Sequence, residues 1–197
     1  TNPEPYATTK AWTLTTGDGS KTVSVKFQDA AGLWSATVQD SITLDTTSPT
    51  GTVVIAQGAA YTTTPTVTLA LTATDATSGV AQMQFSNDGT TYTALEPFAT
   101  SKGWTLTSGD GEKTVRVKFR DAAGNDSAPV SDPITLDASP PSTPTVTDDG
   151  TTTGSTTQLH AQWSPASDPH SGVVAYAYQV RETGPAGLPI RDWTPVG

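Results

Sequence analysis

The chain has 197 residues, no cysteine and a formal net charge of −9. Threonine supplies 39 residues against 10 leucines and 4 isoleucines, a composition that argues against a helical bundle and against an enzyme built from alternating strands and helices. The acidic balance argues against nucleic acid as a partner, and no apolar run approaches the roughly 20 residues that a membrane-spanning helix needs.

A long internal repeat organises the chain. Residues 4–49 align without a gap with residues 96–141, a shift of 92 positions, and 31 of the 46 aligned residues are identical. Self-similarity of this kind is typical of arrays in which each repeat is one structural unit. We therefore expect the two copies to share one backbone, so that each residue of the first copy has an equivalent 92 positions later.

Each copy is predicted to form three strands. In the second strand, Val115, Val117 and Phe119 alternate with charged residues, which is the period of a half-buried strand. A Gly-Asp-Gly sequence before that strand indicates a turn, and two prolines in the third strand indicate an edge position or a bulge. The predicted strands span residues 11–15 in the first copy and residues 103–107, 113–121 and 127–137 in the second.

The segment between the copies adds four predicted strands. Alternation is clearest where Val67, Leu69 and Leu71 are interleaved with threonines, so threonine is expected to form the solvent-facing side of that strand. The four strands span residues 52–56, 65–75, 80–86 and 90–95. Seven short strands in about 92 residues predict an immunoglobulin-type β-sandwich.

Three further strands are predicted after Pro140-Pro141, at residues 144–147, 157–164 and 174–182. Trp163 is followed by Ser-Pro-Ala-Ser-Asp, and Tyr176-Ala-Tyr-Gln-Val comes shortly afterwards. This pattern resembles the opening half of a fibronectin type III domain, in which a tryptophan and a tyrosine of neighbouring strands fill the core. The resemblance implies a further β-sandwich at this end of the chain.

The central unit is similar to the bacterial immunoglobulin-like repeats of large secreted and surface proteins. The resemblance rests on the Gly-Asp-Gly turn, the Val-x-Val-x-Phe strand and the Asp-Ala-Ala-Gly-Asn sequence that follows it at residues 121–125. It implies tandem, mostly non-catalytic modules that act as spacers, display other domains or mediate adhesion. The chain departs from the pattern at both ends, because the first unit lacks its early strands and the last lacks its late ones.

The expected fold is therefore all-β, with tandem sandwiches that are incomplete at both ends. Residues 1–47 are predicted to be the C-terminal half of an immunoglobulin-like repeat, residues 48–139 a complete repeat, and residues 140–197 the N-terminal half of a fibronectin type III-like domain. Short linkers rich in proline predict an extended rod.

Half-sandwiches expose the apolar faces that a complete domain buries. One interpretation is that the chain is a fragment of a longer array of such domains. The other is that the halves complement each other between identical chains and assemble head to tail. The residues that would form these complementation surfaces are Trp12, Val23, Val25, Phe27, Leu159, Trp163 and Tyr178.

Candidate metal ligands are limited to carboxylates. Two histidines and no cysteine argue against a transition-metal site. Calcium prefers oxygen ligands, and the nearest candidates are Asp137, Asp148 and Asp149 beside the second linker, although aspartates in turns commonly bond their own backbone. The sequence predicts no obligatory cofactor and leaves calcium open.

Two loop patterns are candidate sites. Asp75 and Asp168 each begin an Asp-x-x-Ser-Gly-Val sequence, which is best interpreted as a structural turn. Leu33 and Trp34 replace Asn125 and Asp126 of the second copy, and an apolar pair at a turn indicates a contact with a neighbouring domain, a partner chain or a glycan.

No catalytic constellation is present, so the chain is not expected to be an enzyme. The leading hypothesis is a structural stalk or filament-forming segment of an extracellular or surface protein of bacterial origin. The alternative is an adhesive or carbohydrate-binding module that accompanies a secreted protein or enzyme. Expected partners are neighbouring domains of the same array or identical chains, with a glycan or another surface protein under the alternative.

Overall fold

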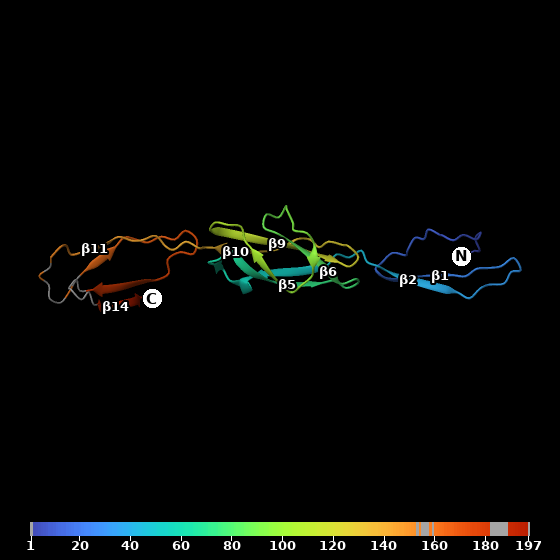
Figure 1. Ribbon diagram of the computed structural model, residues 1–197, viewed down its shortest axis with the longest axis horizontal. Helices are drawn as coiled ribbons and strands as arrows, with labels where there is room; N and C mark the ends of the chain where they lie inside the picture. The colour runs from blue at the N-terminus through green and yellow to red at the C-terminus, as the bar shows by residue number, and fades with distance from the viewer. Residues whose placement is uncertain (1, 153, 155–157, 159, 182–188, 197) are drawn as a thin grey trace. The chain divides into compact units, whose positions relative to one another are not determined.

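The computed structural model describes residues 2–152, 154, 158, 160–181 and 189–196. The fold is all-β (Figure 1), and the described residues contain one short 3-10 turn, η1 (Ala56–Gly58). Among those residues no helix has the length and apolar character that crossing a membrane requires. The strands are β1 (Gly19–Val25), β2 (Val38–Leu44), β3 (Thr50–Ile55), β4 (Tyr61–Thr62), β5 (Thr66–Thr74), β6 (Val80–Ser86), β7 (Glu96–Pro97), β8 (Ser101–Thr105), β9 (Gly111–Asp121), β10 (Val130–Leu136), β11 (Val146–Asp148), β12 (Ala161–Trp163), β13 (Tyr176–Arg181) and β14 (Pro189–Val196).

The chain divides into two compact units. The first comprises Thr1–Ala59, Thr66–Thr107 and Lys113–Pro133, and the second comprises Ala60–Pro65, Ser108–Glu112 and Ile134–Gly197. Strand β10 begins in the first unit and ends in the second.

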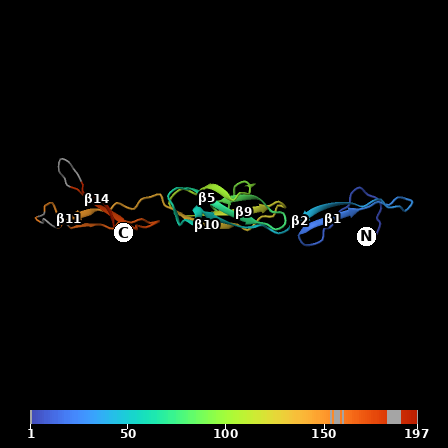
Figure 2. The same cartoon turned by 90° about the horizontal axis from the view of Figure 1, so that it is seen from below.

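The main core lies in the first unit, where β5 and β9 lie together in both views (Figures 1 and 2). One sheet has the order β3-β5-β8, and the other has the order β4-β10-β9-β6-β7. The sheets approach closely at Gly51 of β3, where a Cβ would lie 2.5 Å from Cε2 of Phe119 on β9. The buried apolar residues of this unit are Val53, Ile55, Val67, Leu69, Leu71, Met83, Phe85, Leu106, Val115, Val117 and Phe119.

Strand β5 shows how the sequence pattern sets the two faces. Val67, Leu69 and Leu71 are buried, while the threonines between and beside them are exposed, as predicted. Thr72 also forms a hydroxyl–hydroxyl hydrogen bond of 2.7 Å with Thr52 on β3. Threonine therefore favours the extended backbone and pairs across strands on the solvent side.

Two predicted strands are wrong. Residues 11–15 form no strand, because the equivalent β8 is held by pairing with β5 and the described residues contain no corresponding neighbour for residues 11–15. Residues 90–95 form no strand either. There, Thr93 accepts the Phe85 N–H on its hydroxyl and donates its own N–H to the Phe85 carbonyl. Since the Thr93 side chain takes one position of the ladder, regular pairing on this edge of β6 is confined to β7, while the other edge pairs with β9.

The first copy of the repeat forms the antiparallel pair β1–β2, in register from Gly19–Leu44 to Val25–Val38. It keeps local contacts of the second copy. Tyr6 meets Phe27 edge to face at 5.9 Å between ring centroids, as Phe98 meets Phe119 at the same separation. This contact recurs in both copies, but the predicted common backbone holds only in part, because residues 11–15 form no strand and β1 ends at Val25 where β9 continues to Asp121.

The described residues of the second unit include one edge of the five-stranded sheet and two separate strand pairs. Strand β4 pairs in parallel with the end of β10, where Thr135 lies opposite Tyr61. Strands β11 and β12 pair antiparallel, as do β13 and β14. The strands predicted near residues 144–147, 157–164 and 174–182 are therefore present with different bounds.

Candidate functional site: the contacts around the linkers

The linker after the first copy is held by the aspartate of the Gly-Asp-Gly turn. Asp18 Oδ1 accepts hydrogen bonds from the Thr46 N–H and hydroxyl, at 2.9 and 2.8 Å. Asp18 Oδ2 accepts the Thr47 hydroxyl at 2.6 Å. Because these bonds favour the ionised carboxylate, with that from Thr47 the largest, they lower the pKa of Asp18.

The second copy repeats the arrangement. Asp110 Oδ1 accepts the Ala138 N–H at 2.9 Å. Hydrogen bonds from Ser139 and from Ala138 lower the pKa of Asp110, with the Ser139 hydroxyl contributing most. We call these two sets of contacts, Asp18 with Thr46 and Thr47 and Asp110 with Ala138 and Ser139, the linker clamps. Each fixes the chain just after the last strand of its copy.

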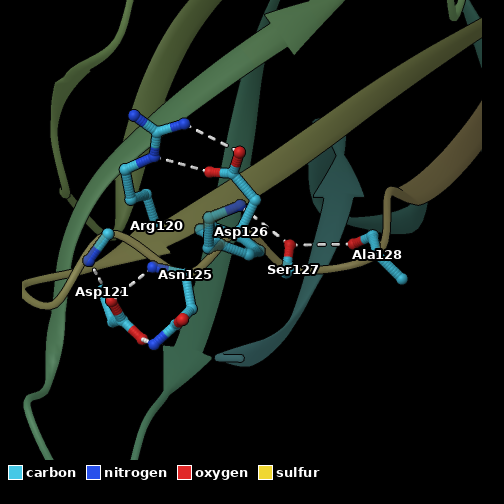
Figure 3. A network of polar contacts seen from close by, with 8 residues as sticks. Arg120, Asp121, Asn125, Asp126, Ser127 and Ala128 are labelled. Carbon is cyan, nitrogen blue, oxygen red and sulfur yellow. Dashed lines mark hydrogen bonds and ion pairs between the residues drawn. The ribbon is translucent and has the colours of Figure 1, made fainter. Parts of the chain in front are cut away.

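The first linker has a second set of contacts on its other side. Asn125 Nδ2 donates to the Asp45 carbonyl at 3.1 Å and to Asp121 Oδ2 at 2.8 Å, and the Ser78 N–H donates to Asp45 Oδ2 at 3.1 Å. Figure 3 shows Asn125 folded back onto Asp121 at the end of β9. Leu33, the equivalent of Asn125 in the first copy, has no side-chain amide that could make such bonds.

The Asp-x-x-Ser-Gly loops are structural turns, as predicted. Asp75 Oδ1 accepts the N–H groups of Thr77, Ser78 and Gly79 at 2.9–3.0 Å. Asp168 Oδ1 accepts three N–H groups in the same pattern, from His170 to Gly172. Burial raises the pKa of the Asp75 carboxyl, but the bonds from Gly79, Thr77 and Ser78 outweigh it and hold that pKa below its ordinary value.

The loop after β9 carries a cross-strand ion pair that the first copy replaces. Arg120 binds Asp126 through two hydrogen bonds of 2.6 and 2.7 Å (Figure 3). The equivalent pair is Gln28 and Trp34, which also face each other across the loop. Both partners of the charged pair are thus replaced together, so that neither copy leaves one charge alone.

Leu33 and Trp34 are exposed as expected, at 69% and 44%. With Phe27, Gln28, Asp29 and Ser35 they line an open hollow of about 390 Å³. Lys26 Nζ lies 4.5 Å from the centroid of the Trp34 ring, a cation–π arrangement. The Leu33–Trp34 pair therefore forms an exposed apolar surface with one positive charge beside it.

The predicted complementation residues of the first copy are accessible. Trp12, Val23, Val25 and Phe27 are all exposed, and Phe27 is 47% exposed where its equivalent Phe119 is completely buried. At the other end, Trp163 is 44% exposed and its ring lies 5.1 Å from that of Tyr176. Tyr178 is half-buried, and Leu159 lies outside the described residues.

The calcium candidates beside the second linker do not form one group of three in the described part of the chain. Asp148 Oδ1 accepts the Gly150 N–H, and Asp149 Oδ2 accepts the His160 N–H and lies 3.5 Å from His160 Nδ1. The group that does converge is Asp45, Asp75 and Asp121. Sequence reasoning missed it because the three are far apart in the chain, although each lies at the end of a strand.

No protein-family model matches the chain, and no curated protein matches it. Among solved structures, it is similar to the fibronectin(III)-like modules of Clostridium thermocellum CbhA, with 16% identity and a TM-score of 0.39 over 61% of this chain and 64% of that one. It is also similar to a tetra-tandem repeat in the extending region of a large adhesion protein, with 22% identity and a TM-score of 0.34 over 91% of this chain and 46% of that one. The chain spans less than two thirds of the length of each of these structures.

Proposed function

We propose that the chain is a non-catalytic structural module of an extracellular or cell-surface protein, in which repeated β-units act as a spacer. The observation that carries this proposal is the linker clamp. The same turn aspartate holds the start of the linker in both copies, although Thr46 and Thr47 are replaced by Ala138 and Ser139. A spacer works only if its junctions resist bending, and the clamps supply that resistance together with the prolines that follow.

The clamps can be tested by removing both carboxylates, as Asp18→Ala with Asp110→Ala. Small-angle X-ray scattering is expected to show a broader distribution of molecular dimensions for this variant than for the unmodified chain. Asp40→Ala is the matched control, since Asp40 lies on an exposed strand and its carboxylate accepts the N–H of its neighbour Ser41, away from either linker clamp. Equal distributions for all three chains would contradict the proposal.

Acid should loosen the same junctions. The pKa values of Asp18 and Asp110 are lowered in the folded chain, so their bonds contribute fully above the ordinary carboxyl pKa of about 4 and are lost as the pH falls through the lowered pKa values of the folded chain. The scattering of the unmodified chain is therefore expected to approach that of the double variant once the pH lies below those lowered values, and the double variant itself is expected to change less over the same pH range.

A finer proposal is that identical chains assemble head to tail by completing each other's half-sandwiches. It is supported by pairs of equivalent residues: Ile42 is 62% exposed and Ile134 is 3% exposed, as Phe27 and Phe119 also differ. Among the described residues, the first copy therefore presents an exposed apolar face where the second copy has a buried one. Burying such a face is the main driving force for association.

Sedimentation velocity over a range of concentrations tests this assembly. We expect oligomers that grow with concentration and that Val25→Asp abolishes, because Val25 lies on the apolar face. Ser24→Asp is the matched control, since neighbouring residues of a strand point to opposite faces. A chain that stays monomeric at millimolar concentration would overturn the assembly and leave the spacer proposal intact.

The exposed Leu33–Trp34 pair supports a second candidate function, adhesion to a glycan or to another surface protein. Indole rings stack on apolar faces of ligands, and the hollow beside Trp34 gives such a ligand a place to lie. A glycan-array signal that is lost in Trp34→Ala and kept in Trp12→Ala would favour this function. The absence of any signal from the unmodified chain would count against it.

A further inference from the structure

One face of strand β9 concentrates positive charge in an acidic chain. The chain has 10 lysines and arginines against 19 aspartates and glutamates. Three of the ten, Arg116, Lys118 and Arg120, alternate along β9 with the buried residues Val117 and Phe119. Their side chains therefore lie on the outer face of the sheet, at intervals of about 7 Å along the strand. We call Arg116, Lys118 and Arg120 the cationic row.

Two members of the cationic row are not neutralised by a carboxylate. Arg120 binds Asp126 through two hydrogen bonds (Figure 3), but neither Arg116 nor Lys118 belongs to the ion pairs that the described residues form. The Oδ1 atom of Asp88, in the turn beside Arg116, accepts the N–H groups of two following threonines at 2.7 Å each, so this carboxylate is bonded within its own turn. Two positive charges therefore remain for a partner outside the sandwich.

The side chains that carry these two charges are held in place. Lys118 Nζ lies 4.6 Å from the centroid of the Tyr92 ring, a cation–π arrangement. Arg116 lies against the turn at Gly89, where an added Cβ would be 3.0 Å from its Cδ and Nε atoms. Both cationic side chains are half-buried, as is usual where long side chains cover their apolar stems and keep the charge in water. Little ordering is thus left to oppose binding.

Two amides stand beside the cationic row. Strand β6 pairs antiparallel with β9, so that Gln84 lies opposite Lys118 and Gln82 lies opposite Arg120. Directly paired residues of neighbouring strands share one face of the sheet, and both glutamines are half-buried. Each side-chain amide offers two donors and an acceptor, which is the chemistry that sugar hydroxyl groups require. The outer face of β6 and β9 thus combines cations with groups that bind hydroxyls.

We propose that this face binds a polysaccharide that carries carboxylates, of the polyuronate class. Arginine and lysine form charge-assisted hydrogen bonds with carboxylates, and the glutamines beside them bind the hydroxyl groups of the sugars. An open sheet face also suits a linear polymer, because its carboxylates can meet successive members of the cationic row. The site is separate from the Leu33–Trp34 pair, and it does not depend on the spacer function.

The charge of the whole chain favours a moderately charged polymer. DNA and heavily sulfated polysaccharides carry their charge densely, so that tight binding needs many cationic contacts. The face offers two unpaired cations in a chain whose net charge is −9, and the remaining acidic groups repel a dense polyanion within about 8 Å at physiological ionic strength. A polyuronate has a single carboxylate on each sugar and hydroxyl groups between the carboxylates. It therefore matches the mixed character of this face.

The first copy of the repeat provides an internal comparison. The residues equivalent to Arg116 and Arg120 are Ser24 and Gln28, and Lys26 alone is retained. The first copy nevertheless forms the β1–β2 pair. The repeated backbone therefore does not require the cationic row, which is a property of the second copy.

Biolayer interferometry with immobilised polygalacturonate tests this surface. The unmodified chain is expected to bind polygalacturonate and to lose affinity as the NaCl concentration rises. It should bind the fully methyl-esterified polymer about tenfold more weakly or less, because the ester keeps the sugars and removes the charge. Arg116→Ser with Lys118→Ser is expected to weaken binding to polygalacturonate by about tenfold or more. Absence of binding by the unmodified chain would overturn the proposal.

Lys10→Ser with Lys21→Ser is the matched control. It removes the same number of positive charges from the first copy and leaves the cationic row intact. Its affinity for polygalacturonate should equal that of the unmodified chain. Equal losses in the two double variants would show that total charge governs binding, which would overturn the proposal.

Tyr92 is expected to act as a positioning residue, because its ring holds the Lys118 ammonium group. Tyr92→Ala should weaken binding by about threefold, whereas Tyr92→Phe keeps the ring and should keep the affinity. Equal affinities of these two variants would overturn this role of the ring.

The comparison between polymers uses the unmodified chain alone, so a variant that folds poorly does not affect it. Heparin and duplex DNA are included at the same NaCl concentration. Weaker binding to both than to polygalacturonate is expected, and tighter binding to either would overturn the assignment of a polyuronate. Equal binding to polygalacturonate and to its methyl ester would overturn the role of the charges.

Discussion

Replacing Phe119 with alanine is expected to lower the free energy of unfolding of the sandwich by about 3–5 kcal/mol. Phe119 is completely buried, it meets Phe98 edge to face, and its ring lies against the backbone of Gly51 in the opposite sheet. Alanine would lose these contacts and leave a cavity that the two sheets cannot close without moving. The free energy of unfolding of this region can be measured in urea, with hydrogen exchange of the β6 and β9 amides as the readout.

The repeat provides the control for this substitution. Phe27→Ala changes the equivalent residue, which is 47% exposed and meets the ring of Tyr6 edge to face. Its cost is expected to be about 1 kcal/mol or less. Similar losses for the two variants would contradict the view that the first copy lacks an opposing sheet in solution. They would show that its apolar face is covered, as it would be in an assembled chain.

Ser127→Ala is expected to cost about 1–3 kcal/mol, because it leaves a buried backbone N–H without an acceptor. The Ser127 hydroxyl accepts the Phe119 N–H at 2.9 Å and donates to the Ala128 carbonyl at 2.8 Å (Figure 3). It thereby holds the segment before β10 against β9, at a position that lies outside the regular pairing of the strands. The free energy of unfolding measured in urea reports this loss.

Ser35→Ala is the control at the equivalent position. Ser35 makes the same two bonds, to the Phe27 N–H and the Ala36 carbonyl, each at 2.9 Å, but in an exposed part of the chain. Water can replace the lost acceptor there, so the cost is expected to stay within about 0.5 kcal/mol. A larger cost for Ser35→Ala than for Ser127→Ala would show that burial does not determine how much this hydrogen bond contributes to the free energy of unfolding.

The strands that could be predicted are those whose two faces differ in chemistry. Strand β6 was predicted with its observed bounds, and the buried face of β5 follows directly from the alternation of threonine with valine and leucine. Residues 11–15 could not be judged in this way, because an equivalent sequence forms β8 only when β5 lies beside it. Pairing partners far away in sequence decide such segments, and the local pattern does not contain them.

The linker contacts were less visible in the sequence. The Gly-Asp-Gly turns were identified as turns from their glycines, but nothing local indicates that Asp18 reaches Thr46, 28 residues later. The convergence of Asp45, Asp75 and Asp121 is hidden for the same reason. The usable signal is positional: each of these aspartates stands where a strand ends, and strand ends from different parts of a sandwich meet at its rim.

The parallel pairing of β4 with β10 has a mechanical consequence. The Thr135 N–H donates to the Ala60 carbonyl at 3.1 Å, and the Asp137 N–H donates to the Thr62 carbonyl at 2.9 Å. In a parallel pair, tension that pulls β4 toward the start of the chain and β10 toward its end slides the strands past each other. Both hydrogen bonds are then stretched together, so they must break at once and not one after the other. A module held in this way resists a pull along its chain far better than an antiparallel hairpin opened from its free end.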